Sequence, residues 1–272
     1  MPLKSKLLKI GRYVANPSLY RYGLRSALRL SNLKDEPIIV CGAPRSGTTL
    51  LISILDSHKE ILAIPFETWL LVNKRRNRWF KRESLNRKFI LLQLKAFLLS
   101  LNITKDHRRW CEKTPTNVFY LDFIFSLFNK KVKVINIIRD GRDVVMSHHS
   151  RLGNFMSPQK WVRYVEEGLK YKNDPNVLTI RYENLIMKYE DTTALIAQFL
   201  NIENTFKPDF YLNTNVSDNT SVISGFGNKG IYEAKPISKQ SLGKWKNNEQ
   251  ITRQFIEFPP ALNLLKQLGY EI

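Results

Sequence analysis

Cysteine and histidine are scarce in this sequence, which has two Cys and four His among 272 residues. No cluster of histidine, cysteine and acidic residues has the spacing of metal ligands, so we expect a protein that needs no metal. Cys41 and Cys111 lie in or beside apolar stretches, and we expect both to be small buried hydrophobic residues rather than a disulfide or a metal pair. A chain without disulfides is consistent with a reducing cytoplasm, which is the location we predict.

The sequence also lacks a long hydrophobic run. The longest apolar stretch, residues 89–103, is interrupted by Gln93, Lys95 and Asn102, and it is too short and too polar to span a bilayer. The N-terminus is basic but has neither the apolar core nor the cleavage site of a signal peptide, and we expect none. An apolar fraction of 43% excludes general disorder, and the length suits one large α/β domain.

Acidic residues are few: 24 Asp and Glu against 43 Lys and Arg give a formal net charge of +19. Such a charge implies an anionic partner, which leaves open a polyanionic cofactor, an acidic substrate, nucleic acid or anionic lipid. The chain has neither an RNA-binding motif with interleaved aromatic residues nor zinc-finger spacing, so nucleic acid is not an expected partner.

Two segments are especially basic. In residues 1–36, Lys and Arg are interspersed with Leu and Tyr at roughly helical spacing. We interpret this segment as a basic helical extension packed on the domain; the alternative is an amphipathic segment in weak contact with an anionic membrane surface. Residues 74–88 are interpreted as the solvated face of a helix or loop, and the alternative places them beside a substrate entrance.

Residues 37–55 predict a strand, a tight loop and a helix. A glycine-rich turn that leads into a helix N-terminus is an anion site, because free backbone N–H groups and the helix dipole point into the loop. From Gly42 to Thr49 the spacing is that of a P-loop, but Thr48 replaces the lysine that reaches the outer phosphates of a nucleoside triphosphate. Arg45 is the only fixed charge in the loop. We therefore predict a phosphate site, but not one for ATP or GTP with magnesium.

Apolar periodicity predicts alternating strands and helices along the rest of the chain. The predicted extended segments are 38–41, 61–64, 110–115, 132–138 and 177–180. The predicted helices are 48–55, 84–101, 118–128, 144–149, 158–171, 192–200 and 254–268, the last interrupted near Pro259; residues 201–241 are interpreted as a long functional loop. This alternation is typical of a three-layer α/β fold, with a parallel sheet covered by helices on both faces. We expect residues 37–272 to form a single domain.

Three motifs resemble the cofactor site of sulfotransferases that use PAPS (3′-phosphoadenosine 5′-phosphosulfate). Residues 44–50, PRSGTTL, resemble the loop that binds the 5′-phosphosulfate, which implies cofactor contacts from Arg45, Ser46, Gly47, Thr48 and Thr49. Residues 139–147 resemble the 3′-phosphate site, with contacts implied for Arg139 and Ser147, and residues 181–185 resemble a segment near the adenine that contains Tyr182. The fold implied is P-loop-like.

Arginine suits a phosphate site because its guanidinium can form two parallel hydrogen bonds with phosphate oxygens, and serine adds a hydroxyl donor. The alternative for this motif is that Arg139 and Asp140 merely pair with each other.

The similarity is greatest to the protein-tyrosine sulfotransferases and covers roughly residues 37–270. Their acid–threonine pair after the second strand matches Glu67-Thr68, their lysine before a proline-containing turn matches Lys113, and their C-terminal signature matches residues 241–245. Counted back from that signature without gaps, Ser224 matches a catalytic serine and Lys235 matches a cofactor-binding lysine.

The resemblance implies in-line transfer of the sulfuryl group of PAPS to an acceptor hydroxyl, a reaction in which positioning and electrostatics dominate. Glu67 would accept the proton of the hydroxyl. Lys113 would neutralise charge on the bridging oxygen, and Arg45 and Ser224 would donate hydrogen bonds to the sulfuryl group.

Two departures leave the acceptor open. The protein-tyrosine sulfotransferases have arginines two and six residues after the glutamate, where this chain has Trp69 and Asn73. Protein tyrosine, carbohydrate, lipid and small molecules therefore all stay candidate acceptors, and the sequence predicts no oligomeric state. The alternatives to a sulfotransferase are a P-loop kinase or NTPase, which would need a lysine at position 48, and a basic module that binds RNA or lipid.

Overall fold

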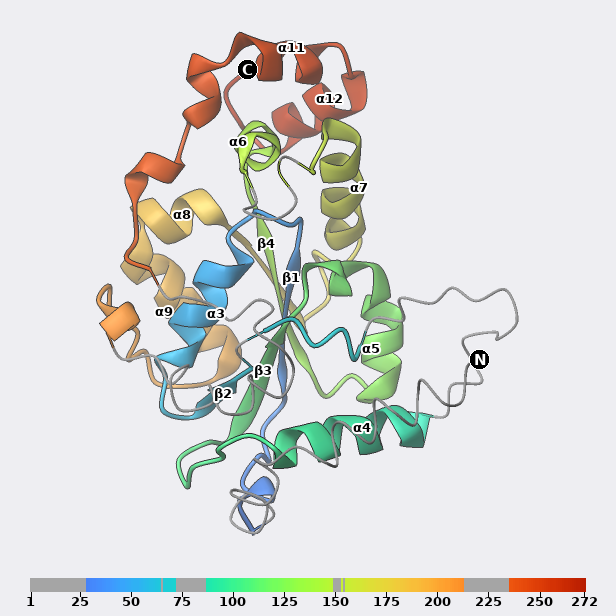
Figure 1. Ribbon diagram of the computed structural model, residues 1–272, viewed down its shortest axis with the longest axis vertical. Coiled ribbons are helices and arrows are strands. Elements are labelled where there is room, and N and C mark those ends of the chain that lie inside the picture. The colour runs from blue at the N-terminus through green and yellow to red at the C-terminus, as the bar shows by residue number, and fades with distance from the viewer. Residues whose placement is uncertain (1–27, 65, 72–86, 149–152, 154, 213–234) are drawn as a thin grey trace.

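The computed structural model describes residues 28–64, 66–71, 87–148, 153, 155–212 and 235–272. Within them, five parallel strands form one sheet in the order β2-β3-β1-β4-β5 (Figure 1). The strands are β1 (Ile38–Gly42), β2 (Ile61–Ala63), β3 (Arg109–Lys113), β4 (Lys133–Ile138) and β5 (Val177–Arg181). Each predicted extended segment is a strand, which confirms the predicted parallel sheet. Most of the predicted N-terminal extension, basic residues 74–86 and Ser224 lie outside the described residues.

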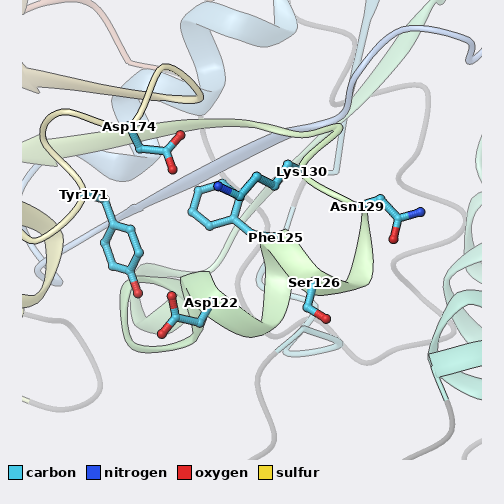
Figure 2. Close-up of a pocket in the computed structure, with 7 residues that line it drawn as sticks. All are labelled: Asp122, Phe125, Ser126, Asn129, Lys130, Tyr171 and Asp174. Carbon is cyan, nitrogen blue, oxygen red and sulfur yellow. The ribbon is translucent and has the colours of Figure 1, made fainter.

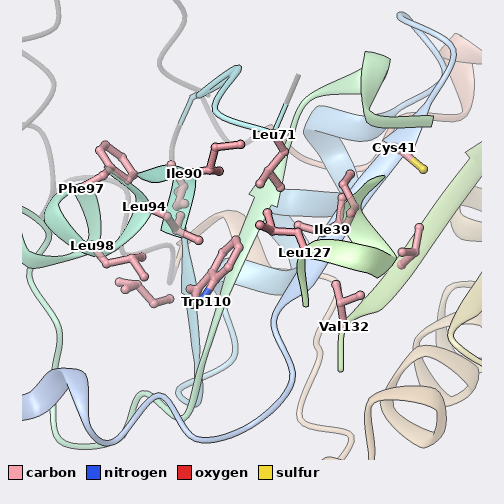
Figure 3. Close-up of a cluster of buried hydrophobic side chains, with 14 of the residues drawn as sticks. Ile39, Cys41, Leu71, Ile90, Leu94, Phe97, Leu98, Trp110, Leu127 and Val132 are labelled. Atoms are coloured by element: carbon pink, nitrogen blue, oxygen red, sulfur yellow. The ribbon is translucent and has the colours of Figure 1, made fainter. Parts of the chain in front are cut away.

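The central strand β1 is buried on both faces, as its run of β-branched residues predicts. Ile38 and Val40 pack into one hydrophobic cluster and Ile39 and Cys41 into another, because successive side chains of a strand point to opposite faces. The first cluster is covered by α3 (Thr48–Asp56), α8 (Tyr182–Met187) and α9 (Tyr189–Leu200), on the left of Figure 1. The second is covered by α4 (Arg87–Leu99), the 3-10 helix η2 (Pro115–Tyr120) and α5 (Leu121–Leu127), and Figure 3 shows part of it.

A third cluster lies beyond the carboxyl end of β4, at the top of Figure 1. It is built by α6 (Gly141–Met146), α7 (Pro158–Leu169), α11 (Glu249–Ile256) and α12 (Pro259–Gln267). At its centre the buried rings of Trp161 and Phe255 pack edge to face, with 5.7 Å between their centroids. The predicted C-terminal helix is confirmed, and it divides before Pro259 because proline opens α12 at its first position.

Several predicted boundaries are wrong. The helix predicted at 144–149 begins at Gly141, because the Asp140 side chain caps it by accepting a hydrogen bond from the Arg142 N–H at 2.9 Å. The helix predicted at 118–128 is divided into η2, which Pro115 opens, and α5. The described parts of the predicted long loop contain two short 3-10 helices, η3 (Phe210–Leu212) and η5 (Lys239–Ser241), and a further one, η6 (Lys244–Asn247), follows the loop.

Both cysteines are free and buried, as predicted. Burial raises the pKa of the Cys41 and Cys111 thiols, so both stay protonated. Among the helices that the structure describes, none has the length and apolar character needed to cross a membrane.

His107 is a buried histidine in the turn before β3, with 4% of its surface exposed. Its Nδ1 accepts a hydrogen bond from the Thr104 N–H at 2.9 Å, which requires an unprotonated Nδ1. Burial lowers the pKa of His107 to about 4; Asp106 opposes this shift and Arg29 adds to it, both to a smaller extent. Folding therefore holds this imidazole in its neutral form.

Acid should consequently destabilise the fold through His107. A depressed pKa contributes stability that is complete above the unfolded-state pKa near 6.5 and is lost as the pH falls through about 4. The loss reaches roughly 3 kcal/mol at the lower end. His107→Asn keeps an acceptor for Thr104 and removes the titration, so urea unfolding between pH 7 and pH 4 should show a flatter pH dependence. An unchanged slope would contradict this account.

Candidate active site

The carboxyl ends of the five strands bring the predicted site residues to one edge of the sheet. Glu67 follows β2, Lys113 ends β3 and the P-loop-like segment, residues 42–47, follows β1. Arg139 follows β4 and Tyr182 follows β5. Read in the order of the sheet, these residues form a row. Glu67 and Lys113, the predicted catalytic pair, lie at one end, the phosphate loop lies in the middle, and Arg139 and Tyr182, predicted to contact the 3′-phosphate and the adenine, lie at the other end. Ligands of open parallel sheets bind at this edge.

The loop that follows β1 comes too close to its neighbours for side chains at its glycines. Gly42 and Gly47 have φ values of 138° and 95°, a region that L-residues rarely adopt. A Cβ on Gly42 would lie 2.3 Å from the Ile137 carbonyl oxygen, and one on Gly47 would lie 2.3 Å from the Tyr182 ring. Both glycines are therefore required by the packing of the loop.

The N-terminus of α3 has the free donors of an anion site. No side chain caps this helix, and its first turn has no acidic residue. The Ser46 hydroxyl is fully buried and has no hydrogen-bond partner among the described residues. Thr48, at the position of the P-loop lysine, is also buried. Unpaired buried donors at a helix N-terminus fit a bound phosphate group.

Arg45 joins the loop to the segment after α6. Its Nε donates to Ser147 Oγ at 2.9 Å and its Nη2 donates to the His148 carbonyl oxygen at 3.0 Å. The Arg139 Nη1 donates to the Arg45 carbonyl oxygen at 2.9 Å. The structure thus brings together three of the residues predicted to bind one cofactor, although they are about 100 positions apart in sequence.

Arg139 lies against Tyr182, with its guanidinium carbon 4.5 Å from the ring centroid. It also donates to the Ser241 carbonyl oxygen, while Ser241 Oγ and the Tyr182 hydroxyl are 2.7 Å apart. Its Nε is buried without a partner among the described residues. The alternative pairing of Arg139 with Asp140 is wrong, because Asp140 pairs with Arg142 at 2.7 Å. A buried arginine with an unused donor fits an anion.

The second aspartate of the RDGRD motif holds the C-terminal signature in place, a role that the sequence analysis missed. The Asp143 carboxylate accepts hydrogen bonds from the Gly243 N–H at 2.8 Å and from the Trp245 N–H at 3.2 Å. Burial raises the pKa of Asp143, and the nearby Arg139 opposes that shift. The Arg142 guanidinium stacks 3.3 Å from the Trp245 ring centroid. Two distant motifs therefore form one unit.

The two predicted catalytic side chains are in direct contact. Lys113 Nζ lies 2.9 Å from Glu67 Oε1. The lysine side chain is 3% exposed and the glutamate side chain is 33% exposed, so the carboxylate faces solvent at the edge of the site. Burial lowers the pKa of Lys113, and Glu67 opposes that shift.

Tyr164 of α7 and Phe119 of η2 pack together against the second hydrophobic cluster. Burial raises the pKa of Tyr164 to about 12, and the negative charge of Glu67 adds to that shift. Tyr164 packs edge to face on Phe119, with 4.6 Å between the ring centroids. Neither residue was predicted from the sequence, where the only signal is their place on predicted amphipathic helices.

The two remaining predicted site residues come from the long segment before the C-terminal signature. Lys235 is described and exposed, and Ser224 lies outside the described residues. Of the two departures from the tyrosine-sulfotransferase pattern, Trp69 has a left-handed φ of 55° and Asn73 lies outside the described residues.

A separate shallow pocket of about 410 Å³ lies at the opposite, amino-terminal edge of the sheet (Figure 2). It is lined by Asp122, Phe125, Ser126, Asn129, Lys130, Tyr171 and Asp174. Burial and the Asp122 carboxylate raise the pKa of Tyr171. None of the predicted site residues lines this pocket.

Known proteins are similar to this chain in sequence and in fold. A sequence model of the Sulfotransferase family matches residues 37–207. The chain belongs to the sulfotransferase family. The protein-tyrosine sulfotransferase of Drosophila melanogaster is 23% identical over 303 aligned positions that cover 99% of this chain, and the chain spans 57% of that protein's length.

Two solved structures show the same fold. The sulfotransferase domain from the Synechococcus PCC 7002 olefin synthase has a TM-score of 0.59 at 18% identity, covering 88% of this chain and 97% of that one. Mouse sulfotransferase SULT7A1, solved in complex with PAP, has a TM-score of 0.51 at 18% identity, covering 86% of this chain and 88% of that one. The predicted family and α/β fold of this sulfotransferase are confirmed.

The contact between Gly47 and Tyr182 can be measured by substitution. Gly47→Ala should destabilise the fold by the strain of a left-handed alanine, about 1–2 kcal/mol, and by a further 1–3 kcal/mol or so of overpacking against the ring. Gly243→Ala is the matched control, because Gly243 also has a positive φ but its Cβ would lie 3.8 Å from the nearest neighbour. Equal losses in free energy of unfolding for the two variants would contradict the close packing.

Proposed function

We propose that this chain transfers the sulfuryl group of PAPS to an acceptor hydroxyl. The observation that carries the proposal is the row of strand ends, with an ion-paired Glu67 and Lys113 at one end, an uncapped phosphate loop at the centre, and Arg139 and Tyr182 at the other. A P-loop kinase is not supported, because the buried Thr48 stands where such an enzyme needs a lysine.

The residues present fit both phosphate groups of this cofactor. The N-terminus of α3 and the buried Ser46 hydroxyl supply unpaired donors for the 5′-phosphosulfate. Arg139, with its unused Nε, and Ser147 are brought together through Arg45 for the 3′-phosphate. The Tyr182 ring lies at the β5 end of the same row, where the adenine would be held. When bound, PAPS supplies the activated sulfuryl group.

Positive charge accumulates at the centre of the row. Burial lowers the pKa of Arg45 and repulsion from Arg139 adds to that shift; burial also lowers the pKa of Lys113, and repulsion from Arg45 adds to it. A bound polyanion would stabilise cations held this close together. These fixed side chains can in turn stabilise the negative charge on the sulfuryl group during its transfer.

Glu67 and Lys113 have different roles in the proposed reaction. Glu67 is partly exposed at the end of the row, where its carboxylate can accept the proton of an incoming hydroxyl. Lys113 is buried beside the phosphate loop, where its ammonium can neutralise charge that develops on the leaving oxygen. The contact between them fixes both groups before substrate binds, which reduces the cost of orienting them.

The acceptor is a hydroxyl-bearing molecule that approaches the partly exposed carboxylate of Glu67. The Drosophila relative is named for protein tyrosine, but Trp69 replaces the first of the two arginines of that pattern. A screen of phenols, tyrosine peptides, sugars and alcohols for release of PAP from PAPS would identify the class.

The cofactor is tested by thermal stability. PAP at about a hundred times its Kd should raise the melting temperature by roughly 5–10 °C without added metal, because a ligand that binds only the folded chain stabilises it. Arg139→Ala should remove most of this gain, while Arg253→Ala, which removes an exposed arginine of α11, should keep it. A larger shift with ATP and magnesium than with PAP would refute the cofactor assignment.

The base is tested by Glu67→Gln, which keeps the shape of the side chain and removes its basicity. We expect turnover to fall by at least about a hundred-fold, the usual contribution of a general base, with PAP affinity changed by no more than a few-fold. Glu190→Gln, at an exposed position of α9, is the control. The measurement is PAP release with the fastest acceptor of the screen. Turnover of Glu67→Gln near that of the unaltered chain would exclude Glu67 as the base.

A further inference from the structure

Glu112 is a buried carboxylate that lies between the strand β3 and the loop after β2. It lies on β3 directly before Lys113, and 1% of its surface is exposed. Its Oε1 accepts hydrogen bonds from the Thr68 N–H at 3.3 Å, from Thr68 Oγ1 at 3.0 Å and from Thr114 Oγ1. Its Oε2 accepts a hydrogen bond from Asn117 Nδ2 at 2.7 Å. All four donors are protein groups.

A carboxylate in this position is costly for the fold. Burial raises the pKa of Glu112, and the hydrogen bonds from Thr114, Asn117 and Thr68 oppose that shift. An apolar residue would fill a buried strand position without this penalty. The carboxylate must therefore provide a connection that an apolar side chain cannot, and its contacts show which one.

The connection is between β3 and the loop after β2. Thr68 donates to Glu112 through both its backbone and its side chain, and its Oγ1 also accepts a hydrogen bond from the Leu70 N–H at 3.2 Å. Thr68 is the residue after Glu67, so the anchored loop determines where the Glu67 carboxylate lies. Residues 112 and 113 are consecutive on β3, so one strand holds both the anchor and the lysine that Glu67 meets at 2.9 Å.

We propose that Glu112 is a positioning residue, which acts through Thr68 to hold the carboxylate of Glu67 against the ammonium of Lys113. The proposal rests on the function proposed above for its meaning in catalysis, but the contact itself can be tested without PAPS. The charged groups that act on Lys113 are Glu67 and Glu112, which raise its pKa, and Arg45, which lowers it.

The test measures the pKa of Lys113 in the full chain by NMR titration of lysines labelled with ¹³C at Cε. The Lys113 signal is assigned by its absence in Lys113→Arg. Thr68→Val removes the hydroxyl donor with little change of shape and should lower the pKa of Lys113, in the same direction as Glu67→Gln. Thr68→Ser restores the donor and should return the pKa to that of the unaltered chain.

Two further variants show whether a change in the pKa of Lys113 comes from the position of Glu67, from the charge of residue 112, or from a general loss of stability. Glu112→Asp keeps the negative charge but withdraws it from Thr68, and it should also lower the pKa of Lys113. Thr193→Val removes a buried hydroxyl in α9 that donates to the Tyr189 carbonyl oxygen at 2.9 Å, and it should leave the pKa unchanged. Because Glu112→Asp provides a second route, the proposal stays testable if Thr68→Val fails to fold.

The double variant gives the decisive comparison. If Thr68 acts through Glu67, then Thr68→Val should lower the pKa of Lys113 no further in a Glu67→Gln background. The proposal is overturned if Thr68→Val and Glu112→Asp leave the pKa at its original value while Glu67→Gln lowers it, or if the effects of Thr68→Val and Glu67→Gln add. It is also overturned if Glu67→Gln itself changes nothing, because the ion pair would then be absent in solution.

Kinetics connect this result to the reaction. With PAPS and the acceptor of the screen, Thr68→Val should lower kcat about ten-fold with the KM for PAPS unchanged, and Thr68→Ser should recover the rate. A rise in KM for PAPS at constant kcat would oppose the proposed role. Absence of PAPS turnover in the unaltered chain would defeat the proposed function and leave the NMR result standing.

Discussion

The structure depends on one geometric constraint: five parallel strands end at the same edge of one sheet. The order β2-β3-β1-β4-β5 is an order in space, and it brings residues from positions 42 to 182 into a single row. In that row Arg45 repels two other cations, Lys113 and Arg139. A protein can hold such a row only if each cation has a partner, and here the partners include Glu67, Asp143, a serine and backbone carbonyls. An anion with several charged groups would relieve the remaining repulsion.

A layer of acidic residues lies directly behind this row. Glu112 anchors the loop after β2, Asp143 anchors residues 243–245, and Asp140 caps α6 while it pairs with Arg142. In each case a carboxylate accepts a hydrogen bond from a backbone N–H: that of Thr68, of Gly243 and Trp245, or of Arg142. Loops that would otherwise move independently are thereby tied to strand ends or to one another. The expense of burying charge is offset by the hydrogen bonds that each carboxylate accepts.

The sequence predicts what depends on neighbours along the chain. Short apolar runs rich in β-branched residues locate β1, β4 and β5, the extended piece that stops at Pro115 locates β3, and the glycines of residues 42–47 locate the phosphate loop. It does not predict that Glu67 meets Lys113, because that contact requires β2 and β3 to be adjacent, which follows from packing of the whole sheet. Nor does it predict the roles of Glu112 or Asp143, whose partners include residues 44 and 100 positions away. The early start of α6 was missed because Asp140 was assigned to a loop rather than to a helix cap.

The burial of both cysteines has a practical consequence for studying this molecule. Cys41 and Cys111 lie inside adjacent strands of the sheet, fully shielded, with thiols that stay protonated and hence unreactive. The native chain therefore behaves towards thiol reagents as if it had no cysteine, so long as it stays folded. A single cysteine introduced at an exposed position would take a fluorophore or spin label selectively. Conversely, reaction of the native pair with a thiol reagent would report opening of the central sheet itself.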